Sequence, residues 1–176
     1  MRQQGEFLFY NVHKALETAF NVQATAGSIK CAAYEVPTAA ATIKDKKTLQ
    51  DRHTESVWIL EVAKGALTAL EWAWVTCTYD GAGQARDDAL QSICDAYASL
   101  HGNAKLLAGC VRREFIFGES YCPSYARVAK DAGCSKEPAV RVGGRVEKAM
   151  RELGRQTSDK LNAAFAAKGW VPRRAA

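Results

Sequence analysis

The segment from Ser124 to Leu153 constrains the fold more than any other, because its residue pattern is that of two helices joined by a glycine turn. Val128 and Ala129 are expected to face inward on a short first helix, with Ala129 small enough for a second helix to cross close to it. Gly133 can adopt the positive φ that ends this helix. The second helix is expected to follow directly, with Ser135 as its N-cap.

The expected pair of helices has the layout of a helix-turn-helix, whose second helix lies in the major groove of DNA. Ala139 and Val142 would face back onto the first helix. Pro138 is tolerable only in the first turn, and Gly143-Gly144 predicts a bend or a break before residue 145, or a close approach to another backbone or to a phosphate. The side chains expected to contact DNA are basic, with the last two placed on phosphates: Lys136, Arg141, Arg145, Arg127 and Lys130.

The charge distribution supports this interpretation. The chain has 24 basic and 19 acidic residues and a net charge of +5. From Cys110 onward there are 14 Lys and Arg against 7 Asp and Glu, and the preceding residues hold 10 and 12. The positive charge therefore coincides with the expected helix-turn-helix, where a phosphate-binding surface would need it.

The rest of the chain shows helical spacing of apolar residues and little strand pattern, so the predicted fold class is mainly α. Gly102 and Gly169 are expected to end helices, and Pro123 to lie in the first turn of one. Residues 24–28 are expected to form a loop. The expected helices cover residues 6–20, 54–78, 86–100, 103–117 and 157–168, in three segments: 1–50, aromatic and uncertain; 51–118, a helical core; and 119–176, basic.

The expected helix over residues 54–78, with Thr54 as its N-cap, carries three tryptophans: Trp58, Trp72 and Trp74. Large aromatic side chains are usually buried, so core packing is the simplest interpretation. The functional alternative is an aromatic face on which another protein docks.

Chemistry-bearing motifs point away from catalysis. The six cysteines form no C-x-x-C pair, and no phosphate-loop, dinucleotide, nucleophile-elbow or zincin motif occurs. Buried, reduced thiols are the expected state of the cysteines, and we expect no metal, no cofactor and no enzymatic activity. No apolar run is long enough to span a membrane and the N-terminal residues lack the apolar region of a secretory signal, so a cytoplasmic protein is expected.

Several short motifs resemble the late-gene antiterminators of phages, the Q-type family. They are Glu55-Ser-Val-Trp-Ile59, Leu70-Glu-Trp-Ala-Trp74, Tyr79-Asp-Gly81 and the Ser-x-x-x-Val-Ala pattern that starts at Ser124. The resemblance covers about residues 52–170 and implies a protein that binds DNA near a late promoter through a sigma-like helix-turn-helix. It also implies that the protein engages paused bacterial RNA polymerase and makes it resistant to pauses and terminators. The zinc-binding cysteine cluster of several family members is not present in this sequence.

Two other functions fit the same sequence. A small terminase subunit for DNA packaging also combines a helix-turn-helix with helical oligomerisation segments, and the oligomeric state would separate it from a transcription factor. A purely protein-binding inhibitor would use the two helices only as a hairpin in its core. Pro138 and the glycine pair at 143–144 keep this third possibility open.

Overall fold

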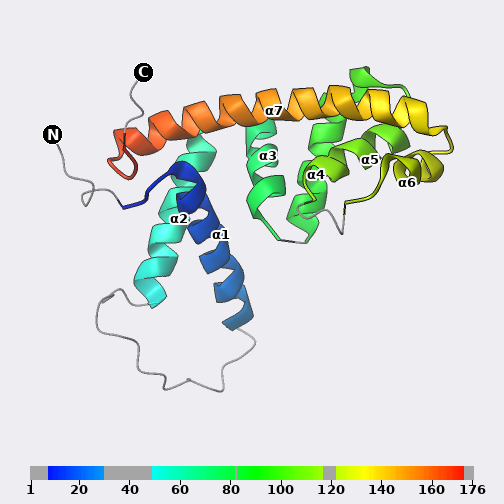
Figure 1. Ribbon diagram of the computed structural model, residues 1–176. Helices are drawn as coiled ribbons and strands as arrows, with labels where there is room; N and C mark the ends of the chain where they lie inside the picture. The colour runs from blue at the N-terminus through cyan, green and yellow to red at the C-terminus, as the bar shows by residue number, and fades with distance from the viewer. Residues whose placement is uncertain (1–7, 30–48, 82, 117–121, 173–176) are drawn as a thin grey trace. The chain divides into compact units, whose positions relative to one another are not determined.

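The computed structural model describes residues 8–29, 49–81, 83–116 and 122–172 and shows a mainly helical fold, as the sequence predicts (Figure 1). The described residues form seven α-helices and one short 3-10 helix, and no strand. None of the described helices is both long and apolar enough to cross a membrane. The helices are α1 (Val12–Ile29), α2 (Leu49–Ala66), α3 (Ala69–Tyr79), α4 (Gln84–Ala96), the 3-10 helix η1 (Ala98–Leu100), α5 (Ala104–Glu114), α6 (Tyr125–Asp131) and α7 (Lys136–Ala167).

The chain divides into two compact units, and α7 contributes residues to both. One unit consists of Met1–Ala66 with Leu161–Ala176, and the other of Leu67–Lys160. The three segments expected from the sequence have other boundaries, and that division stays a prediction.

In the first unit α1 packs against α2. Gln23 Nε2 donates a hydrogen bond of 2.8 Å to Ser56 Oγ between the two helices. The backbone N–H of Phe9 donates to the carbonyl of Trp170 at 3.0 Å. Apolar side chains of these segments are buried: Val12, Ala15, Leu16, Ala19, Ile59, Ala63, Leu161, Phe165 and Val171.

The end of α7 confirms the expected glycine stop. Gly169 has φ +72°, and its N–H donates to the carbonyl of Ala166 while the N–H of Trp170 donates to that of Phe165. These two bonds are the Schellman pattern. The rings of Phe165 and Trp170 pack edge to face with centroids 5.4 Å apart.

The first helix lies further along the chain than predicted. The N–H of Lys14 donates to Asn11 Oδ1 at 2.8 Å, an N-cap bond that starts α1 at Val12. The helix then continues through residues 24–28, which were expected to form a loop, and Thr25 Oγ1 donates back to the carbonyl of Asn21 within it. Residues 30–48 lie outside the described residues.

The expected single helix over residues 54–78 is wrong, because the chain forms two helices there. Thr68 lies between them and caps α3: its hydroxyl accepts from the N–H of Glu71, and Glu71 Oε2 accepts from the N–H of Thr68 at 2.8 Å. This reciprocal capping box satisfies the free donors of the new helix start. Thr54 is no N-cap, since it lies inside α2 and its hydroxyl donates to the carbonyl of Gln50.

Glu71 is a buried carboxylate, only 3% exposed, in the second unit. It receives hydrogen bonds from the N–H and hydroxyl of Thr68, and Lys160 Nζ donates to it at 2.8 Å from α7. Burial alone would raise the pKa of Glu71, but the bonds from Lys160 and Thr68 outweigh it, so that the pKa lies below its ordinary value. The pair therefore joins α7 to the start of α3 by a charge-assisted bond.

The core of the second unit is formed by apolar side chains of α3, α4, α5, α6 and α7. It includes Leu106, Val111, Val128, Ala139, Val142 and Val146 among its buried members. A Cβ at Gly154 of α7 would stand 2.6 Å from Cζ2 of Trp74, so this glycine lets the indole of α3 lie directly against the helix.

Three helix ends differ from the prediction. The α4 helix ends at Ala96, with η1 following, and Gly102 does not have the positive φ of a C′ residue. Pro123 precedes the N-cap Ser124 of α6 and so lies outside the first turn. The expected break at Gly143-Gly144 is absent, since α7 continues as one helix from Lys136 through most of the separately predicted helix over 157–168.

Candidate nucleic-acid interface

The turn between α6 and α7 is set by Gly133. This residue has φ +69°, and its N–H donates to the carbonyl of Lys130 while the N–H of Cys134 donates to that of Ala129 at 2.9 Å. These bonds form a second Schellman turn, which ends α6 in the conformation that favours glycine. The positive φ expected at Gly133 is confirmed, and α7 begins at Lys136, directly after Ser135.

The side chain of Tyr125 in α6 lies close to α7 at Gly143. A Cβ at this position would stand 2.6 Å from Cζ of Tyr125, so only a glycine leaves room for the tyrosine ring. The guanidinium of Arg113 in α5 lies over the ring of Tyr125, 4.3 Å from its centroid. Ala129 is buried as predicted, but Gly143 is the residue that permits the close approach.

The α5 helix packs against α6. Gly109 lets Val128 pack closely, since a Cβ there would meet its Cγ1 at 2.7 Å. Asn103 caps α5 through its side-chain oxygen and donates from Nδ2 to the carbonyl of Ala132 at 3.1 Å, at the end of α6. Both contacts fix α6, and with it the start of α7, on a packed scaffold.

All five basic residues predicted to contact DNA are exposed. Two of them pair with an acidic residue one turn away on their own helix: Arg127 with Asp131 and Arg141 with Glu137, each at 3.3 Å. Such exposed pairs are weak, so a phosphate or a base can replace the carboxylate. The other three form no ion pair with a described residue: Lys130, Lys136 and Arg145.

One further basic residue, Lys148, belongs to the same face of α7. Positions 141, 145 and 148 are spaced i, i+4 and i+7, so Arg141, Arg145 and Lys148 form one exposed stripe. Gly144 lies beside them with nothing within 4 Å of its Cβ position. The spacing was visible in the sequence, but the expected break at the glycine pair concealed it. We call these four residues, together with Lys136 and Val140, the basic face of α7; they spread over the exposed half of the helix, which also carries Glu137 and Glu147.

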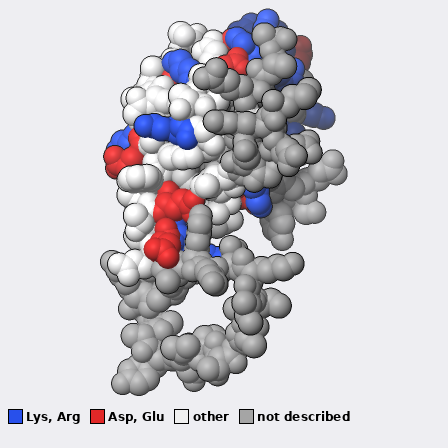
Figure 2. All heavy atoms as spheres, turned by 90° about the vertical axis from the view of Figure 1, so that its left-hand side faces the viewer, with Lys and Arg blue, Asp and Glu red and all other residues white. Residues whose placement is uncertain are grey.

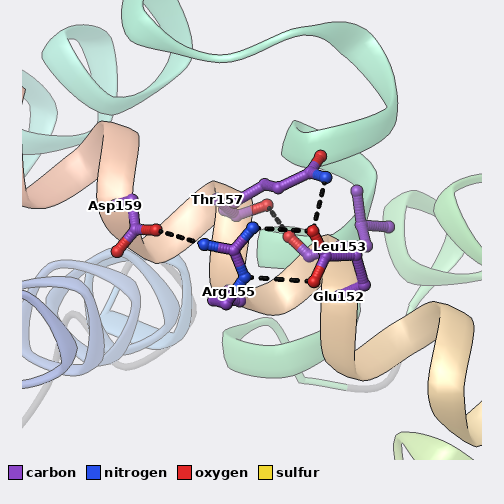
Figure 3. A network of polar contacts seen from close by, with 6 residues as sticks. Glu152, Leu153, Arg155, Thr157 and Asp159 are labelled. Carbon is purple, nitrogen blue, oxygen red and sulfur yellow. Dashed lines mark hydrogen bonds and ion pairs between the residues drawn. The ribbon is translucent and has the colours of Figure 1, made fainter.

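The helix surface beyond Lys148 has its charges balanced. Arg155 donates to Glu152 at 2.7 Å and to Asp159 at 3.0 Å, and Gln156 also donates to Glu152 (Figure 3). Hydrogen bonds from Arg155 and Gln156 lower the pKa of Glu152 to about 2. Arg151 pairs with Glu147 in the same way. The basic side chains of α7 that form no ion pair with a described residue therefore all lie in the first half of the helix.

The described atoms of the face in Figure 2 show basic and acidic side chains interspersed among uncharged ones. This mixed surface gives that face no extended basic area among the residues described there. The candidate interface rests on the exposed basic residues of α6 and of the basic face of α7.

The three tryptophans differ in their surroundings. Trp58 on α2 is 68% exposed, next to the exposed Val57, so its expected core packing is wrong. Trp74 is partly buried and packs against the core and Gly154, and Trp72 is also partly buried. The buried stripe of α2 instead consists of Ser56, Ile59 and Ala63.

The cysteine chemistry near the site is that of buried thiols. Burial raises the pKa of Cys77 and of Cys110 to about 11, and the Cys110 thiol donates a long contact of 3.8 Å to the carbonyl of Ala139. A thiol with so high a pKa stays protonated and is a poor nucleophile and a poor metal ligand. The described residues contain no group of three side chains placed to hold a metal ion.

Comparison with known protein families, with curated proteins and with solved structures finds no match for this chain.

Proposed function

We propose that this protein binds double-stranded DNA and that the first half of α7 is inserted in the major groove. The observation that carries the proposal is the basic face of α7, which follows a glycine turn and bears Arg141, Arg145 and Lys148 on one exposed stripe. On the preceding helix, Arg127 and Lys130 are exposed and suited to the flanking phosphates.

The rigidity of the α6–α7 pair favours a positioned contact over a diffuse one. The side chain of Tyr125 lies against Gly143 and that of Val128 against Gly109, so that neither glycine has room for a Cβ. Because α6 packs on α5 and its Tyr125 ring lies against Gly143 of α7, we expect the arginines to be presented without a costly ordering of the backbone on binding. The arginine forks can then read guanine edges, and the lysines contact phosphates.

For the biological role, we propose transcription antitermination: the protein binds near a late promoter and engages RNA polymerase. The sequence motifs shared with the Q-type antiterminators support this role. The exposed Trp58, which belongs to the first of these motifs, offers a side chain for a protein contact that the core does not use.

The DNA-binding proposal is tested by fluorescence anisotropy with a labelled duplex pool over a range of salt concentrations. Binding should weaken steeply with salt, since each phosphate contact releases counterions. Arg145→Ala should weaken binding by about 1–3 kcal/mol if Arg145 contacts a base edge. Arg155→Ala is the matched control, because Arg155 lies on the same helix but pairs with Glu152 and Asp159.

A wild-type protein with no salt-dependent affinity for the duplex would overturn DNA binding. In that case the exposed Trp58 would favour the second candidate, a helical protein that binds another protein. Antitermination is tested separately by transcription in vitro across a terminator, with polymerase capture on the immobilised protein. DNA binding without readthrough, together with a ring of eight or more subunits in solution, would favour DNA packaging.

A further inference from the structure

We propose that Val140 reads the C5-methyl group of a thymine in the DNA site, an inference that rests on the proposed DNA binding. Val140 is 45% exposed in the first turns of α7. Its neighbours Ala139 and Val142 supply the buried contacts of this turn, and nearly half of the surface of Val140 is left for contact with a partner.

The position of Val140 places it on the basic face of α7. Lys136 precedes it by one turn, Gly144 follows it by one turn, and Arg141 is its direct neighbour, all of them exposed. Gly144 has nothing within 4 Å of its Cβ position, so the wall of a groove can approach the helix beside Val140. The exposed side of this part of α7 carries Lys136, Arg141, Arg145 and Lys148 against Glu137 and Glu147, and this excess of positive charge favours a polyanion over an apolar protein surface as the partner.

Within duplex DNA, one apolar group is available in the major groove. Thymine presents its C5-methyl there, and apolar side chains discriminate it from cytosine and from uracil. A valine flanked by charged side chains can remove this methyl group from water while the neighbouring arginine and lysine hold the strands. The structure thus gives α7 two kinds of reading element: arginine forks for guanine and Val140 for thymine.

The test uses the full chain and a duplex chosen by selection from a randomised pool. Each thymine of the selected site is replaced in turn by uracil, which lacks only the methyl group. One replacement should weaken wild-type binding by about fourfold, as expected for the loss of one buried methyl. In Val140→Ala the same replacement should change binding by less than about 1.5-fold, whereas Val140→Thr, which keeps a methyl, should retain most of the effect.

Val57→Ala is the matched control, since Val57 is an exposed valine of α2 with similar exposure, 40%. It should bind and discriminate like the wild type. Uracil-insensitive binding by the wild type, or full discrimination in Val140→Ala, would overturn the assignment of Val140 while leaving DNA binding intact. No binding to any duplex would overturn both proposals together.

Discussion

The ring of Tyr125 lies so close to Gly143 that a Cβ at this glycine would stand 2.6 Å from Cζ of the tyrosine. The next residue, Gly144, faces open space. Two adjacent glycines in one helix therefore have opposite roles: the first makes room for a neighbouring helix, and the second faces solvent. Their substitution gives a matched pair.

We expect Gly144→Ala to stabilise the protein by about 1 kcal/mol, because alanine is the better helix former and the added methyl meets nothing. Gly143→Ala gains the same helix preference but forces Tyr125 away from α7, and overpacking of this kind costs about 1–3 kcal/mol. The unfolding free energies of the two variants, measured in urea, should therefore differ by about 1–3 kcal/mol. Equal stability of the two would contradict the close packing of Tyr125.

Glu71 should make stability depend on pH. Its pKa in the folded protein is below the ordinary value of 4.5, so its contribution is complete above that value and is lost as the pH falls through the lower folded-state pKa. Unfolding free energies measured from about pH 6 down to about pH 3 should therefore fall in the wild type.

In Glu71→Gln this part of the pH dependence should disappear, and stability at neutral pH should drop by about 1–3 kcal/mol through the weakened capping box and the unpaired Lys160. Glu17→Gln serves as the control, since Glu17 is an exposed residue of α1 paired with Lys14. A pH profile of Glu71→Gln that matches the wild type would show that another carboxylate is responsible.

Lys148 should contribute to DNA affinity without contributing to sequence preference. Lysine contacts phosphates as a point charge, so Lys148→Ala should weaken binding to selected and unselected duplexes alike and reduce the salt slope by about 1. The measurement is a salt titration of both duplexes. A larger loss for the selected duplex would instead place Lys148 at a base edge.

Trp58 should account for most of the tryptophan fluorescence that iodide quenches. It is 68% exposed, whereas Trp74 packs against the core and Gly154. Trp58→Phe should therefore reduce the quenchable fraction with little change in stability, and Trp74→Phe should leave that fraction nearly unchanged. If RNA polymerase protects the wild-type signal from iodide, the same titration also tests the proposed protein contact.

Local chemistry in the sequence predicted the ends that glycine controls. Gly133 and Gly169 both adopt the expected positive φ, and Val128, Ala129, Ala139 and Val142 are buried as their spacing indicates. These features depend on a few neighbouring residues, and so a sequence pattern contains them. The exposure of the predicted basic residues follows in the same way, from their places opposite the buried positions.

The interruptions of helices were predicted less well, because tertiary contacts decide them. A glycine pair suggested a break at residues 143–144, but packing of Val142 and Val146 into the core keeps α7 continuous there. Conversely, apolar spacing suggested continuity over residues 54–78, although the Thr68 and Glu71 pair was a readable capping box that starts a new helix.

Because α7 is one unbroken helix, the directions in which its side chains point around the helix axis are fixed relative to one another. Each residue turns the helix by about 100°, so one inserted residue would rotate everything after it by that amount. An insertion just after Lys148 would leave the basic face and the Tyr125 contact in place, but would turn Lys160 away from Glu71 and Gly154 away from Trp74. Point substitutions on this helix should be tolerated far better than changes of its length.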